Sequence, residues 1–400
     1  MKKIVGIVTA AAIATSVFAA DVSAATKIKG NLFNYGADET IQLFAQGNDS
    51  HDYANPNMTF SISDDKAGAT IKLTTDGSTL NVAQTTQTIW FKPVDALKIS
   101  VGSYDLALNK EKIDWTESVT GLGGNGYVAS INASGFALDV FLNEGNNGAF
   151  WFKDAKSVKA AAADAAYTEA YNAYLNDKFP TDANKAAAKA AAEAVKKAIL
   201  EGKDPDPALA EFGVKASYGA DFGTIGAFVD INRTGNRWTY HDNLVHIDYK
   251  KEGAIQNVLF GAGYANNFDG IDVFANVVGY MGDKFDWIRP EVYVSGSADA
   301  FGYSLFAAPV IWTNSDLNKD TECEVVAKVT YAMDGITPYA YFKSFDVIGK
   351  NFDDDGSKFI STIKLGATGS VGAMGWNAWV QLDVADKTAF SVPFELTMSF

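Results

Sequence analysis

The sequence is short of cysteine, histidine and proline: its 400 residues include one cysteine, three histidines and nine prolines. Because Cys323 is alone, an intramolecular disulfide is excluded. No cluster of cysteines and histidines has metal-ligand spacing, so no metal site and no cofactor is expected. No residue set has hydrolase spacing either, and an enzyme is not predicted. Beyond the first 20 residues, no apolar run is long enough for a transmembrane helix, so any membrane crossing must use strands.

The N-terminus combines a short basic stretch with an apolar run. Lys2 and Lys3 precede the apolar residues 4–20, and small residues follow. This pattern predicts a secretory signal over residues 1–24, with cleavage after Ala24, and it is favoured over an anchor helix because the apolar run is short and interrupted. The net charge of −15 argues against nucleic acid or an anionic lipid surface as a partner.

The C-terminus alternates strictly between large apolar and small or polar residues. The apolar set is Phe390, Val392, Phe394, Leu396, Met398 and Phe400. Such a run predicts a strand with one apolar and one polar face. Its length is that of a tilted strand crossing a membrane, about 9–11 residues.

Similar runs recur along the chain. They give 18 candidate strands when Ile41–Gln46 is counted as the first and Lys27–Tyr35 is left as an optional addition. Short turns such as Ser134-Gly135 alternate with long polar connections, provided that residues 232–256 form a single connection. The expected fold is all-β, a transmembrane antiparallel up-and-down β-barrel of 16–18 strands with 18 favoured. A soluble periplasmic sandwich is the alternative.

Residues 154–211 interrupt the strand pattern with an alanine-rich stretch that favours helix. A first helix is expected over residues 157–176, and a second after Thr181-Asp182 with one face formed by Ala188, Ala191, Val195 and Ile199. The barrel, residues 25–400, would carry this helical hairpin insert in an outer loop. Three roles stay open for the insert: a plug in the lumen, an outward prong that binds a partner, and a solvated decoration.

Two glycine-containing motifs resemble binding motifs in part. Residues 121–126 match the G-x-G-x-x-G pattern, but they lack the strand and helix of a dinucleotide site, and a loop is expected there. Residues 351–356 begin like a calcium loop without its final glutamate, which favours a solvated acidic loop. The aromatics near predicted strand ends, among them Trp90, Tyr280, Trp287 and Trp312, are expected either in interface girdles or in core packing.

The signal, the repeated hairpins, the strand segment Trp90–Ile99 and the Phe400 terminus together resemble bacterial outer-membrane porins, and most of all the porin-like barrels of spirochaetes. The resemblance implies passive diffusion of small hydrophilic solutes through a water-filled barrel in the cell outer membrane. It also implies contact with outer-membrane lipid, insertion by the barrel-assembly machinery and a homotrimer. Phe394, Leu396, Met398 and Phe400 would be the assembly signal. The alternative is a surface structural or adhesive protein that uses the barrel only as an anchor.

Alternation also predicts which charged side chains line the lumen. The predicted pore-lining set is Lys72, Lys92, Lys98, Asp139, Lys215, Asp230, Arg289, Glu291, Glu324, Lys328, Lys343, Lys364, Asp383 and Glu395. Both signs are present, so these charges would either set up a field across the pore or pair and hold the wall together.

Overall fold

The computed structural model describes most of the chain outside the connections. It describes residues 21–35, 41–43, 57–75, 82–109, 121–143, 182–202, 211–233, 257–282, 284–315, 321–344, 361–384 and 388–399, with most of 163–171 and the single residues 255 and 347.

The described chain is nearly all strand, with one long helix. In the first half lie β1 (Asp21–Tyr35), β2 (Ile41–Leu43), β3 (Asn57–Ser63), β4 (Ala67–Thr75), β5 (Val82–Val94), β6 (Leu97–Ala107), β7 (Gly121–Ala133), β8 (Phe136–Asn143) and the helix α3 (Asp182–Glu201). In the second half lie β9 (Phe212–Ala220), β10 (Gly223–Ile231), β11 (Val258–Phe268), β12 (Ile271–Met281), β13 (Phe285–Ala298), β14 (Phe301–Trp312), β15 (Glu322–Tyr331), β16 (Ile336–Ser344), β17 (Ser361–Val371), β18 (Met374–Val384) and β19 (Ala389–Ser399). Among the described helices, none is long and apolar enough to cross a membrane.

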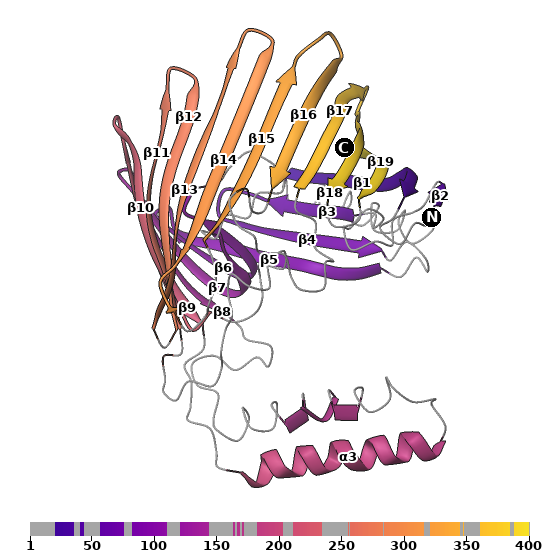
Figure 1. The fold of residues 1–400 in the computed structure, drawn as a ribbon. Coiled ribbons are helices and arrows are strands. Elements are labelled where there is room, and N and C mark those ends of the chain that lie inside the picture. Colours follow the sequence, from indigo (N-terminus) through magenta and orange to yellow (C-terminus); the bar gives the residue numbers. More distant parts are fainter. Residues whose placement is uncertain are drawn as a thin grey trace.

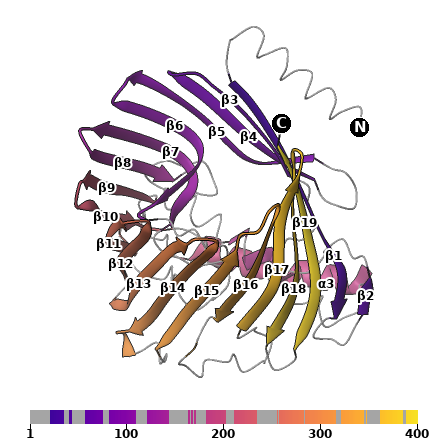
Figure 2. The same cartoon turned by 90° about the horizontal axis from the view of Figure 1, so that it is seen from above.

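The strands form an up-and-down barrel sheet. From β3 to β19 every strand pairs antiparallel with its neighbours in the chain, and Figure 2 shows them following one another around an interior space. β1 pairs with β19 from Ala25 to Tyr35 and with β3 from Asp21 to Lys27. Only residues 25–27 of β1 pair with both β19 and β3, so the two ends of the sheet are joined at this seam over three residues, and the sheet is not closed along the rest of β1.

The long strands number 18, as favoured from the sequence, but the first of them was misassigned. The sequence interpretation counted Ile41–Gln46 as a strand, whereas β2 has only three residues and pairs with the end of β1. The optional run Lys27–Tyr35 is instead part of β1, a strand of 15 residues. Its two lysines and two asparagines obscure the period-2 pattern, which explains the error.

Alternate residues along each strand face opposite sides of the sheet. In β8 the buried residues are Asp139, Phe141 and Asn143, while Phe136 and Val140 on the other face are more than 40 % exposed. Figure 2 places the concave side around the interior. The exposed apolar side chains lie on the outer face of the strands, and the charged ones lie on the inner face. This is the division between lipid-like and water-like faces that the C-terminal pattern predicts.

Short and long connections are separated between the two ends of the sheet. The two-residue turn at Ser134-Gly135 has positive φ angles of 50° at Ser134 and 81° at Gly135, and glycine adopts the second without strain. β10 pairs directly with β11, so residues 232–257 are a single connection, as the strand count required. The hairpin turns of β11 to β16 lie at one end of the sheet in Figure 1, and α3 lies beyond the opposite end.

The helix α3 spans the range expected for the second helix of the insert. Ala188 and Ala192 are fully buried, so the packed side runs through Ala192 and not through Ala191. Lys196 forms an ion pair with Asp164 and lies 5.9 Å from the ring centroid of Tyr167, both in the preceding helical segment. These contacts join the two helical segments into a hairpin.

Residues 121–126 are strand and not the expected loop. They form the first half of β7, paired with β6 from Gly121 to Gly126. A Cβ on Gly126 would lie 1.9 Å from the carbonyl oxygen of Leu142, so the backbones approach too closely for a side chain there. Glycines carry no hydropathy pattern, and this hid the strand from the sequence interpretation.

Candidate functional site: the inner wall

The 14 charged residues predicted to line the lumen all lie on the inner face of their strands. Asp139, Asp230, Arg289, Glu291, Glu324, Lys343, Lys364 and Asp383 are buried, and the other six are partly buried. The structure gathers them into several local groups rather than one ring.

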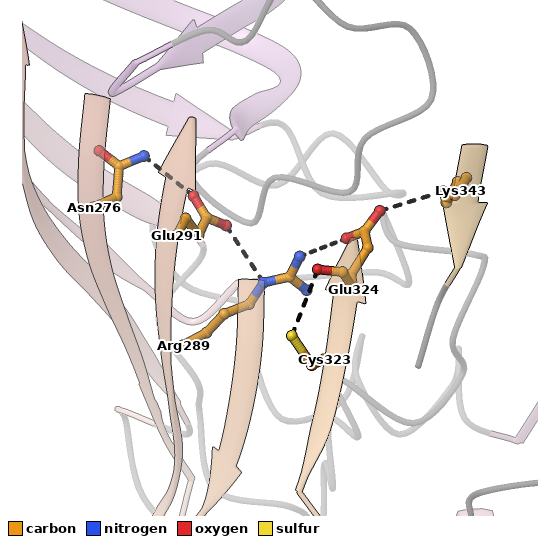
Figure 3. A network of polar contacts seen from close by, with 6 residues as sticks. All are labelled: Asn276, Arg289, Glu291, Cys323, Glu324 and Lys343. Carbon is orange, nitrogen blue, oxygen red and sulfur yellow. Dashed lines mark hydrogen bonds and ion pairs between the residues drawn. The ribbon is translucent and has the colours of Figure 1, made fainter. Parts of the chain in front are cut away.

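The largest group is a chain of ion pairs across β12 to β16, shown in Figure 3. Arg289 Nη2 donates to Glu324 Oε2 at 2.7 Å, and Arg289 Nε lies 3.5 Å from Glu291 Oε1. Lys343 Nζ lies 3.4 Å from Glu324 Oε1. Asn276, which the sequence interpretation did not single out, donates from Nδ2 to Glu291 Oε2 at 3.1 Å. We call these five residues the inner-wall network.

The sheet geometry explains how Arg289 reaches Glu324 over an intervening strand. β14 lies between their strands, and the residue of β14 in register with Glu324 is Ala308, whose small side chain leaves room above the sheet. The network has two cations and two carboxylates, so it is neutral overall. Buried charges need opposite partners, and each charge here has one within 3.5 Å.

A connection enters the interior and contacts the network. Asn109, just after β6, donates from Nδ2 to Asn276 Oδ1 at 2.6 Å. Two glycines make space for this segment: a Cβ on Gly226 would lie 2.6 Å from Leu108 Cδ1, and one on Gly263 would lie 2.9 Å from Asn109 Nδ2. The start of the β6–β7 connection therefore packs on β10 to β12.

Much of the inner wall around the network is apolar. One buried cluster spans β7 to β14 and comprises Leu122, Val128, Phe141, Phe228, Leu259, Val278, Tyr280, Trp287 and Val310, with Leu106, Leu108 and Trp312 packed against it. A second comprises Phe274, Tyr293, Phe306, Ala308, Val326 and Tyr341. Tyr280 and Trp287 thus belong to the inner packing, with ring centroids 5.8 Å apart, and they are not girdle residues.

A second polar group lies on β7 to β9. Lys215 Nζ is 3.1 Å from Asp139 Oδ2, and the Ser130 hydroxyl donates to Asp139 Oδ1 at 2.6 Å. Lys215 and Asp139 are in register across β8 and β9, so this pair follows directly from the alternation pattern. Near the long-connection end, Asn143 Nδ2 donates to Glu211 Oε2 at 2.6 Å, a bond that the sequence interpretation missed.

Asp230 pairs with a residue that was not predicted. Arg233 Nη1 lies 3.5 Å from Asp230 Oδ2, and both side chains are buried. Arg233 follows the end of β10. It therefore lies outside the alternation pattern from which the inner-facing charges were derived.

A third group combines a lysine with aromatic rings on β16 to β18. Lys364 Nζ lies 5.0 Å from the ring centroid of Tyr341 and 5.6 Å from that of Trp379. Trp379 Nε1 donates to Gln381 Oε1, and Gln381 Nε2 donates to Asp383 Oδ2 at 2.7 Å. The neighbouring Lys328 lies 5.2 Å from the ring of Tyr339. These cation–π contacts supplement ion pairs on this wall.

Near the short-turn end, Lys92 and Lys98 lie beside Trp90, at 5.6 and 4.8 Å from its ring centroid. Trp90 is thus on the lysine-bearing face and is not a girdle residue. Its ring covers Gly68 on the neighbouring strand, where a Cβ would lie 2.6 Å from Trp90 Nε1. Glycine at position 68 is required for this ring position.

The adjoining turns contain the groups with clear pKa shifts. Hydrogen bonds from the backbone N–H groups of Lys66 and Ala67 lower the pKa of Asp64 below its ordinary value of 3.8. Lys66 hydrogen-bonds and ion-pairs with Asp95 in the β5–β6 turn, which raises the pKa of Lys66 and lowers that of Asp95. This pair links two hairpin turns.

The remaining predicted residues lie on β4 and β19 or outside the described residues. Lys72 of β4 and Glu395 of β19 lie on the inner face. Of the expected assembly signal, Phe394 and Leu396 are partly buried and Met398 is 40 % exposed on the outer face, while Phe400 lies outside the described residues. The acidic stretch 351–356 and the histidine-containing region 241–246 also lie outside them.

Comparison with known proteins shows the fold. No protein-family description matches the sequence, and no curated protein sequence matches it. Among solved structures, OpdL of Pseudomonas aeruginosa aligns with a TM-score of 0.53 at 7 % identity, over 95 % of this chain and 98 % of that protein. The outer membrane protein OpdK of the same organism aligns with a TM-score of 0.52 at 8 % identity, over the same shares. The chain therefore has a porin-type β-barrel fold, as predicted.

Proposed function

We propose that the protein is an outer-membrane channel of porin type, through which small hydrophilic solutes diffuse passively. One observation carries the proposal: an 18-strand barrel sheet with exposed apolar side chains on its outer face and charged side chains on its inner face. A barrel of 16–18 strands is wide enough for an aqueous channel. The outer face would contact outer-membrane lipid after insertion by the barrel-assembly machinery, and three copies would form a homotrimer. No catalytic role is proposed.

The inner wall suggests where water would pass. On β7 to β14 the inner side chains pack into buried apolar clusters, and the β6–β7 connection lies against β10 to β12. On β4 to β6 the inner side chains include Thr70, Lys72, Lys92 and Lys98, all partly exposed. The aqueous path would therefore follow the β4 to β6 wall, with the inner-wall network holding the opposite side in place.

Single-channel conductance in a planar bilayer tests the function. Purified, refolded protein should give conductance steps of nanosiemens scale, as expected for a wide aqueous pore. Stable, heat-modifiable β structure that inserts but gives no steps would contradict the channel. It would instead support a surface protein that uses the barrel as an anchor.

The helical hairpin favours that second candidate function. In Figure 1, α3 lies beyond the strand ends at the long-connection side, where it would reach outward. Apart from the side carrying Ala188 and Ala192, its described side chains are mostly exposed. Deleting residues 154–201 separates the roles: unchanged conductance excludes a plug or constriction, and lost binding to cell-surface or host material without lost conductance identifies a binding prong.

A further inference from the structure

The strand that joins the two ends of the sheet begins inside the predicted signal. β1 starts at Asp21, four residues before the cleavage position expected after Ala24. These four residues pair with β3, with Asp21 opposite Ser63, Val22 opposite Ile62, Ser23 opposite Ser61 and Ala24 opposite Phe60. β1 pairs with β19 only from Ala25 onward. Residues 21–24 therefore form most of the β1–β3 side of the seam.

Cleavage after Ala24 would remove this part of the seam. Only residues 25–27 of β1 would remain paired with β3, opposite residues 57–59. The backbone of Phe60–Ser63 would keep its partner in β4 but lose the one in β1. Four of the seven register pairs between β1 and β3 would be lost, and the backbone N–H and C=O groups that leave such pairs find no water partner in hydrocarbon.

The lost pairs would lie in a row that leads to apolar side chains of the outer face. Following the register across the sheet, Ile62 is opposite Ala69, Ala69 is opposite Ile89, and Ile89 is opposite Val101. Ile89 and Val101 are 53 % and 38 % exposed on the outer face. The row that contains Val22 and Ile62 therefore runs through the outer apolar side chains and does not extend beyond them.

We infer that Asp21–Ala24 remain in the mature chain and that the signal is removed by hydrolysis of the Ala19–Ala20 peptide bond. The inference rests on the proposed membrane position of the barrel. Ala19 and Val17 supply small aliphatic residues at the first and third positions before that bond, a spacing typical of signal cleavage. Ala24 and Val22 provide the same spacing before Ala25, so the pairing of residues 21–24 with β3 decides between the two bonds. A signal peptidase adds water across the bond, leaving the new carboxylate on Ala19 and the new amino group on Ala20.

N-terminal sequencing and intact mass of the protein extracted from the outer-membrane fraction test the inference. The mature chain is expected to begin at Ala20. A start at Asp21 would keep the residues that pair with β3 but would overturn the assigned bond. A mature chain that begins at Ala25, or anywhere after Asp21, overturns the inference. The result does not depend on conductance: protein that begins at Ala20 but gives no channel contradicts the proposed function and supports this processing site.

Paired substitutions locate the cleaved bond. Ala19→Leu places a large residue next to the proposed bond and should cause uncleaved precursor to accumulate, whereas Ala24→Leu should be processed at the wild-type rate. The opposite outcome, with processing blocked by Ala24→Leu alone, overturns the inference. Both changes replace alanine by leucine, so they differ in position and not in chemistry.

A cross-link tests the seam directly. In a Cys323→Ser background, Ser23→Cys and Ser61→Cys occupy opposite positions of β1 and β3. Mild oxidation should give a disulfide that changes the mobility of the processed protein. Ser23→Cys combined with Thr70→Cys, one strand further away, is the matched control and should give none. Processed protein that lacks residue 23 cannot form either cross-link, and its recovery overturns the inference.

Discussion

The Nδ2 atom of Asn109 donates a hydrogen bond of 2.6 Å to Oδ1 of Asn276, joining the segment after β6 to β12 across the interior. Asn276 in turn donates to Glu291, which ion-pairs with Arg289. The amide of Asn276 therefore uses its acceptor for the incoming segment and its donor for the wall. Such linked hydrogen bonds in a buried setting stabilise one arrangement over alternatives.

Removing this hydrogen bond should affect the conductance of the proposed channel more than the stability of the barrel. Asn109→Ala deletes the donor, so the β6–β7 connection loses its hydrogen bond to β12. We expect larger current fluctuations and an altered mean conductance in single-channel recordings. Asn132→Ala, at an exposed position near a short turn, is the control and should behave as wild type. Recordings of Asn109→Ala that are indistinguishable from wild type would show that the bond does not hold the connection in place.

Truncating Glu324 should destabilise the barrel strongly. Its carboxylate ion-pairs with both Arg289 and Lys343, so Glu324→Ala removes a carboxylate that two buried cations share. Removal of one partner from a buried pair costs about 3–5 kcal/mol. Asp334→Ala, in the exposed β15–β16 turn, should change stability by less than about 0.5 kcal/mol. Urea-dependent unfolding of both variants in detergent or lipid provides the comparison, and equal stabilities would count against the network.

The proposed water path can be mapped by cysteine modification. In a Cys323→Ser background, Thr70→Cys places a thiol on the partly exposed wall, and Val278→Cys places one in the buried apolar cluster. A charged thiol reagent should reduce conductance only for Thr70→Cys. Reaction at position 278 with a drop in current, and none at position 70, would place the water on the other wall.

The β3–β4 turn should lose stability in acid. Because the pKa of Asp64 is lowered in the folded protein, its contribution is present above the ordinary value of 3.8 and is lost as pH falls through the folded value. Asp64→Asn should therefore have a lower melting temperature than wild type at about pH 6, with the difference shrinking toward about pH 2. For Lys66 the sign is reversed. Because its pKa is raised, its contribution to stability is present below the ordinary value of 10.5 and is lost as pH rises through the folded value. If the difference in melting temperature between Asp64→Asn and wild type grows in acid, the hydrogen-bonded turn is contradicted.

A side chain at Gly68 should displace the Trp90 ring. Gly68→Ala places a Cβ within 2.6 Å of the indole nitrogen, an overpacking that costs about 1–3 kcal/mol. Gly375→Ala is the matched control because its nearest contact would be an ordinary 3.8 Å. Thermal unfolding should separate the two variants. In a Trp90→Leu background the cost of Gly68→Ala should fall, and an unchanged cost would assign the effect to the backbone instead.

Much of the architecture follows from period-2 alternation. In β15 the alternating residues placed Glu324 inward and Val325 outward without any knowledge of neighbouring strands, because a strand has only two faces. The same rule found both members of the Lys215–Asp139 pair. The rule fails where residues carry no contrast: the glycines at the start of β7 and the mixed residues of β1 gave no readable period.

Contacts between strands could not be predicted in the same way. Arg289 meets Glu324 because Ala308 leaves a gap over β14, which depends on register across three strands. Arg233 and Asn109 lie beyond strand ends, where no period applies. The inward position of Trp287 was one of two alternatives that the sequence left open, since an aromatic near a strand end fits an interface girdle and an inner cluster equally well.

The seam formed by β1 has a consequence for the order of assembly. Every pairing from β3 to β19 joins neighbours in the chain, and such local contacts require little search. The β1–β19 pairing joins opposite ends of the chain, so its formation must overcome the largest loop-closure entropy in the molecule. The sheet should therefore be able to form as a curved, open intermediate before its ends meet. Joining β1 to β19 would be the slow, committing step of folding.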